Sequence, residues 1–160
     1  MERVKASGKA RSIGVSNFRQ EHLEAILKTA TVPPSINQTE FHPYLQRENL
    51  VPWAKSKGIA TAAYAPLTPV TKGRPGPLDN LLAPIAKKHA VNEGEILLRW
   101  CMDQDVVAIT TSSKEQRMSD MLRVAAFKLT PREVEDLTRT GLEKRFRAFW
   151  AAKFAKGDYR

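Results

Sequence analysis

Apolar residues follow one another along this chain in two alternating patterns. Short and nearly continuous apolar runs, such as the one at Val106–Thr110, are typical of buried parallel strands. Longer stretches between them carry apolar residues at helical spacing. The predicted strands are Lys9–Val15, Ser35–Phe41, Ile59–Ala65 and Val106–Thr110. Because helical stretches alternate with these strands, the predicted class is α/β with a parallel sheet.

Capping residues and helix breakers set the expected helix ends. The predicted helices are Met1–Ser7 as the last turns of a helix, a segment after Asn17, Arg47–Lys57, Leu78–His89, Glu93–Met102, Lys114–Leu122 and a segment that opens at Thr130. Asn92 with Glu95, and Thr130 with Glu133, have the spacing of a capping box. Both pairs therefore predict sharply defined helix starts.

Three further positions shape the expected connections. Asn17 with Gln20 has a spacing like that of a capping box, so Asn17 is a candidate N-cap. Pro52 lies inside a predicted helix and indicates that this helix starts late or kinks. The loop Thr68–Pro77 is long and rich in proline and glycine in its second half. Its length favours a functional loop over a simple connector.

The number of predicted strands is too small for a closed barrel. A (β/α) barrel needs about eight strands and about 250 residues, whereas this chain has 160 residues. No internal repeat makes up the difference. The expected architecture is half a barrel, with four parallel strands and helices on one side. Uncovered strand edges and an uncovered interior favour association. A homodimer, or a partner that supplies the other half, is therefore expected.

Composition describes a globular protein, with 42% hydrophobic and 27% charged residues. No apolar run approaches the roughly 20 residues of a membrane span, so no membrane partner is expected. Residues 1–5 lack the apolar region of a secretory signal. The single cysteine, Cys101, excludes an internal disulfide and favours a reducing, cytoplasmic location. Its helical context predicts a core residue and not a nucleophile.

The net charge of +9 raises nucleic acid as a partner. Residues 1–20 hold five basic and one acidic side chain, and residues 141–160 hold six and two, which gives +4 at each end. Only about +1 is left for the body of the chain. Without a basic stripe along the body, specific nucleic-acid binding is not expected. No cluster of histidine, cysteine and carboxylate has the spacing of metal ligands either.

Candidate chemistry lies where the predicted strands end. Ser16 and Asn17 follow the first strand, and barrel enzymes carry their sites at this end of the strands. Glu40 and His42 are two residues apart at the end of the second strand and share a face. An acid/base pair is therefore one interpretation. The alternative is that His42 only braces the junction between strand and loop.

Four segments resemble the aldo-keto reductases, in register and in the family's order. They are Gly8–Phe18, Asn37–Tyr44, Ala63–Leu67 and Ile96–Trp100. The resemblance covers only the C-terminal half of the family, over residues 1–140, and leaves residues 141–160 as a basic and aromatic tail. It implies a TIM-barrel type fold truncated to roughly the last four βα units. The implied activity is that of an oxidoreductase, which reduces an aldehyde or ketone with NADPH.

The resemblance also implies an NADP(H) site. Its matched positions are Ser16, Asn17 and Gln38 for the nicotinamide carboxamide, Tyr64 for stacking on the ring, Leu67 near the pyrophosphate, and Ser112 and Arg117 for the 2′-phosphate. A guanidinium suits a phosphate, so Arg117 favours the phosphorylated cofactor. The chain departs from the family at Ala65, Thr111 and Met121, where serine, lysine and asparagine are common. These departures predict weakened cofactor binding.

Other interpretations of this site remain open. Asn17 can serve only as an N-cap, and Gln38 can satisfy a neighbouring backbone group. The family's catalytic tyrosine, lysine, aspartate and histidine belong to the first four strands, which have no counterpart here. The histidines and tyrosines that do not match this tetrad are His22, His42, His89, Tyr44, Tyr64 and Tyr159. Activity would then need a partner half. The alternatives are a repurposed isomerase or cyclase and an inactive fragment.

The remaining candidates lie outside this site. His22 and His89 fall on helices and are expected to be solvated. The tail Phe146–Phe154 mixes aromatic and cationic side chains. In the family, the corresponding tail folds over the substrate pocket. In this chain it can equally cover the barrel interior, or bind nucleic acid without sequence preference.

Overall fold

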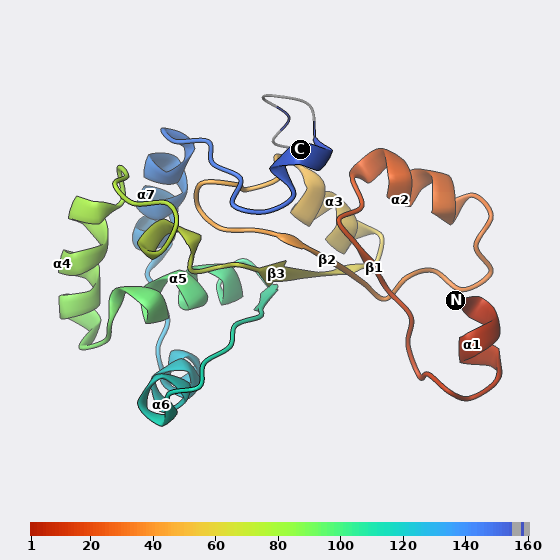
Figure 1. Ribbon diagram of the computed structural model, residues 1–160, viewed down its shortest axis with the longest axis horizontal. Helices are drawn as coiled ribbons and strands as arrows, with labels where there is room; N and C mark the ends of the chain where they lie inside the picture. Colours follow the sequence, from red (N-terminus) through yellow and green to blue (C-terminus); the bar gives the residue numbers. More distant parts are fainter. Residues whose placement is uncertain (155–157, 159–160) are drawn as a thin grey trace.

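A computed structural model describes residues 1–154 and 158 of the chain (Figure 1). Four parallel strands form one sheet in the order β1-β2-β3-β4. The strands are β1 (Val15–Ser16), β2 (Ile36–Glu40), β3 (Ala60–Tyr64) and β4 (Val106–Ala108). The predicted α/β class with a parallel sheet is therefore confirmed.

The first strand is much shorter than predicted. Only Val15 and Ser16 pair with β2, whereas Lys9–Val15 was expected to be the strand. β1 lies at the edge of the sheet and has a neighbour on one side only. Residues 9–14 therefore have no second strand to pair with. The Ser35 N–H donates to the Ile13 carbonyl and the Lys5 ammonium donates to the Arg11 carbonyl.

Seven α-helices connect and follow the strands within the described residues. They are α1 (Glu2–Ala6), α2 (Gln20–Leu27), α3 (Leu50–Ser56), α4 (Asp79–His89), α5 (Glu93–Met102), α6 (Glu115–Arg123) and α7 (Pro131–Leu142). Short 3₁₀ turns lie at Thr68–Val70, Val124–Ala126 and Ala151–Lys153. The predicted capping boxes of α5 and α7 are confirmed, because Asn92 and Thr130 each accept the N–H of the glutamate three residues on.

Two predictions about helix starts have different outcomes. α3 starts late, as Pro52 predicted, and Pro52 becomes its third residue. At that position the N–H has no partner within the helix, so proline removes no helical hydrogen bond there. The N-cap of α2 is Arg19 and not Asn17. The backbone of Asn17 instead turns into the left-handed region, with φ of 59°.

The register of the sheet sorts the strand residues into two faces. Ser16 pairs with Gln38, Gln38 with Ala62, and Glu40 with Tyr64, so these side chains share one face. The intervening residues face the helices, and the main core lies on that side and beneath α4, α5 and α7. There the rings of Phe41 and Trp100 stack with centroids 5.1 Å apart. A smaller cluster of Leu23, Leu50, Ala54 and Ile59 lies under α2 and α3.

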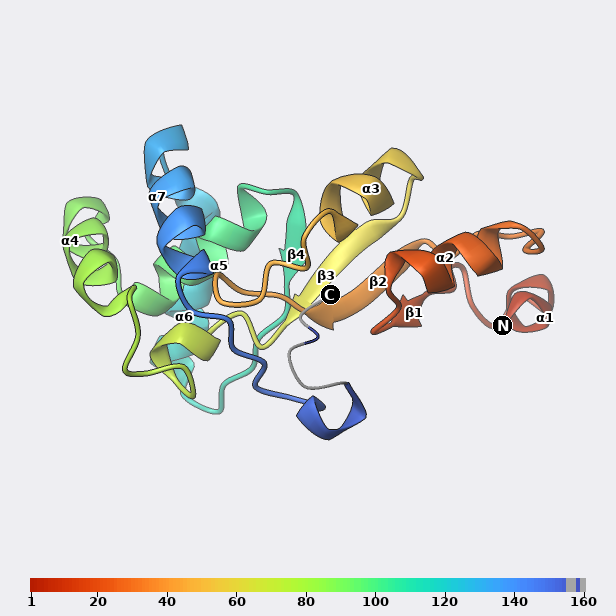
Figure 2. The same ribbon diagram turned by 90° about the horizontal axis from the view of Figure 1, so that it is seen from above.

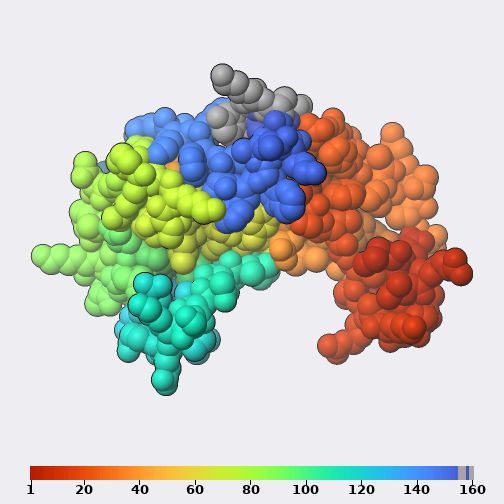
Figure 3. All heavy atoms as spheres, in the orientation of Figure 1, coloured from red at the N-terminus to blue at the C-terminus, as the bar shows by residue number. Residues whose placement is uncertain are grey.

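The opposite face of the sheet is uncovered along β4, as the half-barrel predicts. Val107 pairs with Ala62 in the register and is 53% exposed, and Ile109 is 39% exposed. α2 and α3 lie above the strands in Figure 1, whereas α1 and α6 lie at the two ends of the molecule and lower in this view. Figure 3 shows the hollow that is left between α1 and α6.

Candidate functional site

The carboxyl ends of β1, β2 and β3 bring four of the predicted cofactor residues together. The Tyr64 hydroxyl donates to Asn17 Oδ1 over 2.9 Å, and Asn17 Nδ2 donates to Ser16 Oγ over 3.2 Å. The Ser16 hydroxyl and the Asn17 N–H both donate to the Gln38 carbonyl, at 2.9 and 2.8 Å. The positive φ of Asn17 turns its side chain toward Tyr64 and away from the helix it was expected to cap.

The Gln38 side chain lies on the same face and is half-buried. Within residues 1–154 and 158, its amide forms no hydrogen bond. The interpretation that this amide satisfies a neighbouring backbone group is therefore wrong for the described part of the chain. Its donor and acceptor remain available to a ligand at the end of the sheet.

Two adjoining cavities extend from this cluster across the end of β4. The first has a volume of about 390 Å³ and is lined by Tyr64, Leu67, Thr111 and Phe149, among others. The second, of about 380 Å³, is lined by Leu67, Thr111 and Arg117, among others. Because they share Leu67 and Thr111, they form one groove that runs from Tyr64 to Arg117, which we call the cofactor groove.

Of the predicted phosphate residues, Arg117 lines the groove and Ser112 does not. Arg117 lies on α6 and is exposed. Ser112 lies in the preceding loop, where its Oγ accepts the Lys114 N–H over 3.1 Å. Thr111 and Met121, two of the three positions at which a departure from the family was noted, both line the second cavity. The groove therefore holds one guanidinium at its far end.

The acidic residues that line the second cavity were not predicted from the sequence. Glu95 and Asp120 line the second cavity, and Arg123 binds both, at 3.1 and 3.2 Å. The hydrogen bond and charge of Glu95 raise the pKa of Arg123 further. Asp120 follows Arg117 by three residues on α6, and this helical spacing was a signal that both share a face.

Glu40 and His42 are in contact, as their spacing predicts. His42 Nε2 lies 3.1 Å from Glu40 Oε1, and both side chains are fully buried. Burial lowers the pKa of His42 and outweighs the carboxylate beside it. For Glu40, burial acts against ionisation, but hydrogen bonds from His42 and from the Ala148 and Phe149 N–H groups lower the pKa. The pair is therefore an ionised carboxylate with a neutral imidazole.

The burial of this pair favours the structural interpretation of His42. The Ala148 and Phe149 N–H groups approach the carboxylate to 2.6 and 3.1 Å. The Arg47 side chain also donates to the Glu40 carbonyl over 2.8 Å. With its oxygens occupied in this way, the Glu40 carboxylate holds the C-terminal tail against the sheet.

The tail lies at the carboxyl ends of β2 and β3 (Figure 2). Phe149 meets the Tyr64 ring edge to face, with centroids 6.0 Å apart at 83°. The Lys72 ammonium lies 3.8 Å above the Phe149 ring. Farther along, Arg19 forms an ion pair of 3.2 Å with Asp158. The described part of the tail therefore covers the strand ends and not the open face of the sheet.

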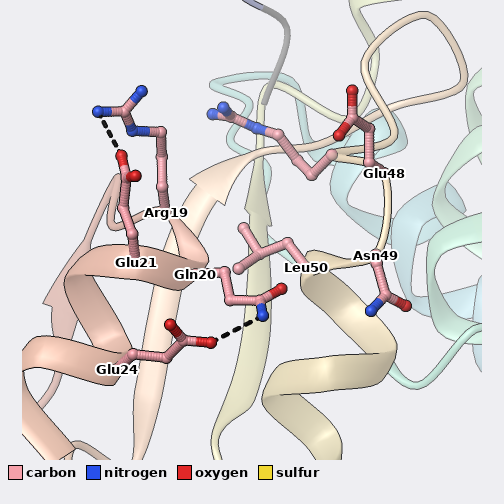
Figure 4. Close-up of a pocket in the computed structure, with 8 residues that line it drawn as sticks. Arg19, Gln20, Glu21, Glu24, Glu48, Asn49 and Leu50 are labelled. Atoms are coloured by element: carbon pink, nitrogen blue, oxygen red, sulfur yellow. Dashed lines mark hydrogen bonds and ion pairs between the residues drawn. The ribbon is translucent and has the colours of Figure 1, made fainter.

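A third cavity, of about 250 Å³, lies between α2 and the start of α3 (Figure 4). Its lining residues are Arg19, Gln20, Glu21, Glu24, Arg47, Glu48, Asn49 and Leu50. Several of these pair with one another, since Arg19 binds Glu21 over 2.6 Å and Gln20 binds Glu24 over 2.8 Å. The cavity is thus a polar recess that was not predicted, and it shares no lining residue with the cofactor groove.

The other candidate residues are two histidines and a cysteine, which do not line the groove, and one tyrosine. His22 is exposed, as expected, but His89 is half-buried, tilted on Phe127, and 3.1 Å from Glu133, which corrects the prediction that it is solvated. Cys101 is buried, and burial raises the pKa of its thiol strongly, as fits a core residue. Tyr159 lies outside the described residues.

Residues 1–154 and 158 contain no group of three or more histidines, cysteines or carboxylates arranged to hold a metal ion. None of their helices has the length and apolar character that crossing a bilayer requires.

Comparison with known proteins decides the family. The model of the aldo/keto reductase family matches residues 1–141. The chain belongs to the aldo/keto reductase family. An NADPH-dependent alpha-keto amide reductase of Saccharomyces cerevisiae is 39% identical, over 99% of this chain and 53% of the yeast protein. An NAD/NADP-dependent indole-3-acetaldehyde reductase of Schizosaccharomyces pombe is 38% identical, over 93% of this chain and 53% of that protein.

Solved structures of aldo-keto reductases have the same fold. The Bombyx mori aldo-keto reductase in complex with NADP superimposes with a TM-score of 0.83 and 32% identity, over 92% of this chain and 50% of that one. An aldo-keto reductase from a deep-sea metagenome library gives 0.83 and 31%, over 91% of this chain and 54% of that one. The chain thus spans about half the length of the aldo/keto reductases it matches, which agrees with a half-barrel of TIM-barrel type.

Proposed function

We propose that this aldo/keto reductase chain carries the cofactor-binding half of an NADP(H)-dependent oxidoreductase, which reduces an aldehyde or ketone to an alcohol. The observation that supports this proposal best is the cofactor groove. It joins the hydrogen-bonded cluster at Tyr64 to the guanidinium of Arg117. The names of the yeast relatives and the NADP-bound neighbour support the choice of cofactor.

The chemistry at the two ends of the groove fits such a dinucleotide. Amide and hydroxyl groups of Ser16, Asn17 and Gln38 offer both donors and acceptors to a carboxamide. Of these three candidates, the Gln38 amide is best placed to bind a carboxamide, because it forms no other hydrogen bond in the described residues. At the far end, Arg117 can bind a phosphate through two parallel N–H groups. When bound, NADPH would supply the hydride, while these residues would orient its nicotinamide.

Reduction of a carbonyl also needs a proton donor and a wall for the substrate. In the family, the tyrosine, lysine, aspartate and histidine that provide this step belong to the first half of the barrel. We propose that a partner supplies that half, either a second copy of this chain or a separate polypeptide. The exposed Val107 and Ile109, together with the edge strands β1 and β4, support this proposal, since both edges can accept a neighbouring strand.

Calorimetric titration of the purified chain with NADPH tests the cofactor proposal. We expect binding at millimolar concentration or better, and no binding in that range would overturn it. An assay with generic aldehydes tests the partner proposal. We expect no turnover from the chain alone, and turnover after co-expression with the first half of the Saccharomyces cerevisiae relative. Turnover by the chain alone would show that no partner half is needed. Light scattering that finds a stable monomer would count against the homodimer.

A further inference from the structure

The C-terminal tail is anchored at the site by its backbone. The Phe146 N–H donates to the Tyr44 carbonyl over 3.1 Å, and the next anchor is the Glu40 carboxylate, which accepts the Ala148 and Phe149 N–H groups. Two consecutive N–H groups on one buried carboxylate make a strong, charge-assisted contact. The segment from Phe146 to Phe154 is therefore held in a defined place at the strand ends, and we call it the strap.

The anchor places the Phe149 ring inside the cofactor groove. Phe149 lines the same cavity as Tyr64, Leu67 and Thr111. Its ring contacts the Tyr64 ring edge to face, and the ammonium of Lys72, which also lines the cavity, lies 3.8 Å above the ring. Tyr64 is the residue on which the nicotinamide ring is proposed to stack. An aromatic side chain of this chain therefore packs against Tyr64 in the cavity where the nicotinamide is proposed to stack.

The strap can also detach from the strand ends without unfolding the sheet. No residue from Ala148 to Phe154 is fully buried, and Phe149 and Trp150 are 40% and 56% exposed. No strand or α-helix follows the strap among the described residues. Opening of the strap from Ala148 onward therefore exposes little apolar core. It breaks the two hydrogen bonds to Glu40, the contacts of the Phe149 ring and the ion pair of Arg19 with Asp158. A segment held in this way can exchange between closed and open positions.

We propose that the strap is an autoinhibitory contact: Phe149 and the nicotinamide ring compete for the space beside Tyr64, so NADP(H) binds only when the strap opens. The proposal rests on the proposed cofactor site. A ligand that binds only the open form has an apparent affinity reduced by the fraction of molecules that are open. By the same linkage, bound cofactor holds the strap open. The groove therefore couples cofactor loading to the position of the C-terminal tail.

The test compares Phe149→Ala with Trp150→Ala in the full chain. Phe149→Ala removes the competing ring, so calorimetry with NADPH should give a dissociation constant at least about threefold lower than in the wild type. Trp150→Ala removes a neighbouring aromatic ring that does not line the groove, and it should leave the constant unchanged. An unchanged or weaker affinity in Phe149→Ala would overturn the proposal. Circular dichroism confirms that both variants are folded.

A second pair of measurements follows the strap directly. In the wild type, NADPH should speed tryptic cleavage after Lys153, because the cofactor holds the strap open. Glu40→Gln weakens the anchor without changing the groove, and it should speed this cleavage in the absence of NADPH. Cleavage that NADPH slows would overturn the proposal. If neither the wild type nor Phe149→Ala binds NADPH, both the proposed function and the autoinhibition proposal are wrong. If both bind NADPH with equal affinity, only the autoinhibition proposal is wrong.

Discussion

His42 Nε2 lies 3.1 Å from Glu40 Oε1, and neither side chain has exposed surface. Burial keeps the imidazole neutral by lowering the pKa of His42, so its Nε2–H donates to the ionised carboxylate. The two residues are separated by one position of an extended strand end, which places them on one face. Burial, and not the carboxylate, keeps the imidazole neutral, because the contact with Glu40 acts to raise the pKa of His42. The contact positions the carboxylate for the tail, and the buried pair makes the fold sensitive to acid.

The first prediction concerns this sensitivity. The pKa of His42 is lower in the folded chain than its ordinary value of 6.5, so the unfolded chain takes up a proton first as the pH falls. Stability should therefore be full above pH 6.5 and should fall below it by up to about 1.4 kcal/mol per pH unit. The pKa of Glu40 is also lowered from 4.5, which adds a second loss below that pH. Urea unfolding between pH 8 and 4 measures this profile.

His42→Asn tests the assignment, because asparagine keeps a donor but does not titrate. At pH 8 we expect this variant to be less stable by about 1–3 kcal/mol, since packing and a buried hydrogen bond are lost. Between pH 6.5 and 5 it should lose less stability than the wild type. His22→Asn is the matched control, because His22 is exposed, and its profile should parallel that of the wild type. A parallel profile in His42→Asn would contradict the assignment.

A second buried carboxylate, Glu133, gives a prediction in a lower pH range. Burial opposes its ionisation, but hydrogen bonds from Lys88, from the Thr130 N–H and from His89 lower its pKa to about 2. Its contribution is therefore fully present above the ordinary value of 4.5 and is lost as the pH falls toward 2. Glu133→Gln should destabilise the chain at pH 7 by on the order of 2 kcal/mol.

The control for Glu133→Gln lies on the same helix. Glu135 is exposed, so Glu135→Gln should change the free energy of unfolding at pH 7 by less than about 0.5 kcal/mol. The difference between the two variants should shrink when unfolding is measured at pH 3. If the difference stayed constant between pH 7 and pH 3, the loss would come from packing and not from the charge.

Local patterns were enough to predict most of the elements. The strand at Ala60–Tyr64 carries small residues with Thr61 and Tyr64, and the starts of the helices after Asn92 and Thr130 are specified by their capping boxes. These signals lie within a few residues of the structure they specify. The parallel sheet then follows from the alternation of strands and helices.

Contacts between distant residues were not predictable in the same way. Asn17 has the short amide side chain of an N-cap, but its backbone is left-handed and its side chain accepts a hydrogen bond from Tyr64, 47 positions along the chain. The anchor of the tail on Glu40 spans 108 positions. Such contacts depend on how the strand ends meet, which no local pattern specifies. The family resemblance placed Ser16, Asn17, Gln38 and Tyr64 correctly as neighbours because it carries that long-range information.

The third prediction concerns close packing at the end of α7. A methyl group on Gly141 would lie 2.4 Å from the Pro43 carbonyl oxygen, which is backbone and cannot turn aside. The Gln46 side chain holds that same carbonyl over 2.8 Å, so the loop resists movement. Alanine favours a helix over glycine by up to about 1 kcal/mol, but the overlap should outweigh this gain. We expect Gly141→Ala to destabilise the chain by about 1–3 kcal/mol.

Thermal unfolding measures the effect, with Leu142→Ala as the control. Leu142 is the next residue on the helix and is 53% exposed, so its truncation should cost less than about 1 kcal/mol. A Gly141→Ala variant as stable as the wild type would show that the Pro43 loop yields to the methyl group.

The last prediction concerns the choice between the two nicotinamide cofactors, and it depends on Arg117 at the far end of the cofactor groove. A guanidinium gains charge-assisted hydrogen bonds with the 2′-phosphate, which NADH lacks, and such bonds contribute about 1.5–3 kcal/mol. Arg117→Ala should therefore raise the dissociation constant of NADPH by about 10-fold or more and leave that of NADH unchanged.

Arg117→Lys keeps the charge without the paired geometry and should give an intermediate value of the dissociation constant for NADPH. Arg132→Ala controls for the loss of one positive charge, because Arg132 is 91% exposed on α7 and should leave both constants unchanged. Calorimetry with each cofactor decides the matter. An equal loss of affinity for NADPH and NADH in Arg117→Ala would mean that Arg117 contacts a group common to both, and the 2′-phosphate assignment would be wrong.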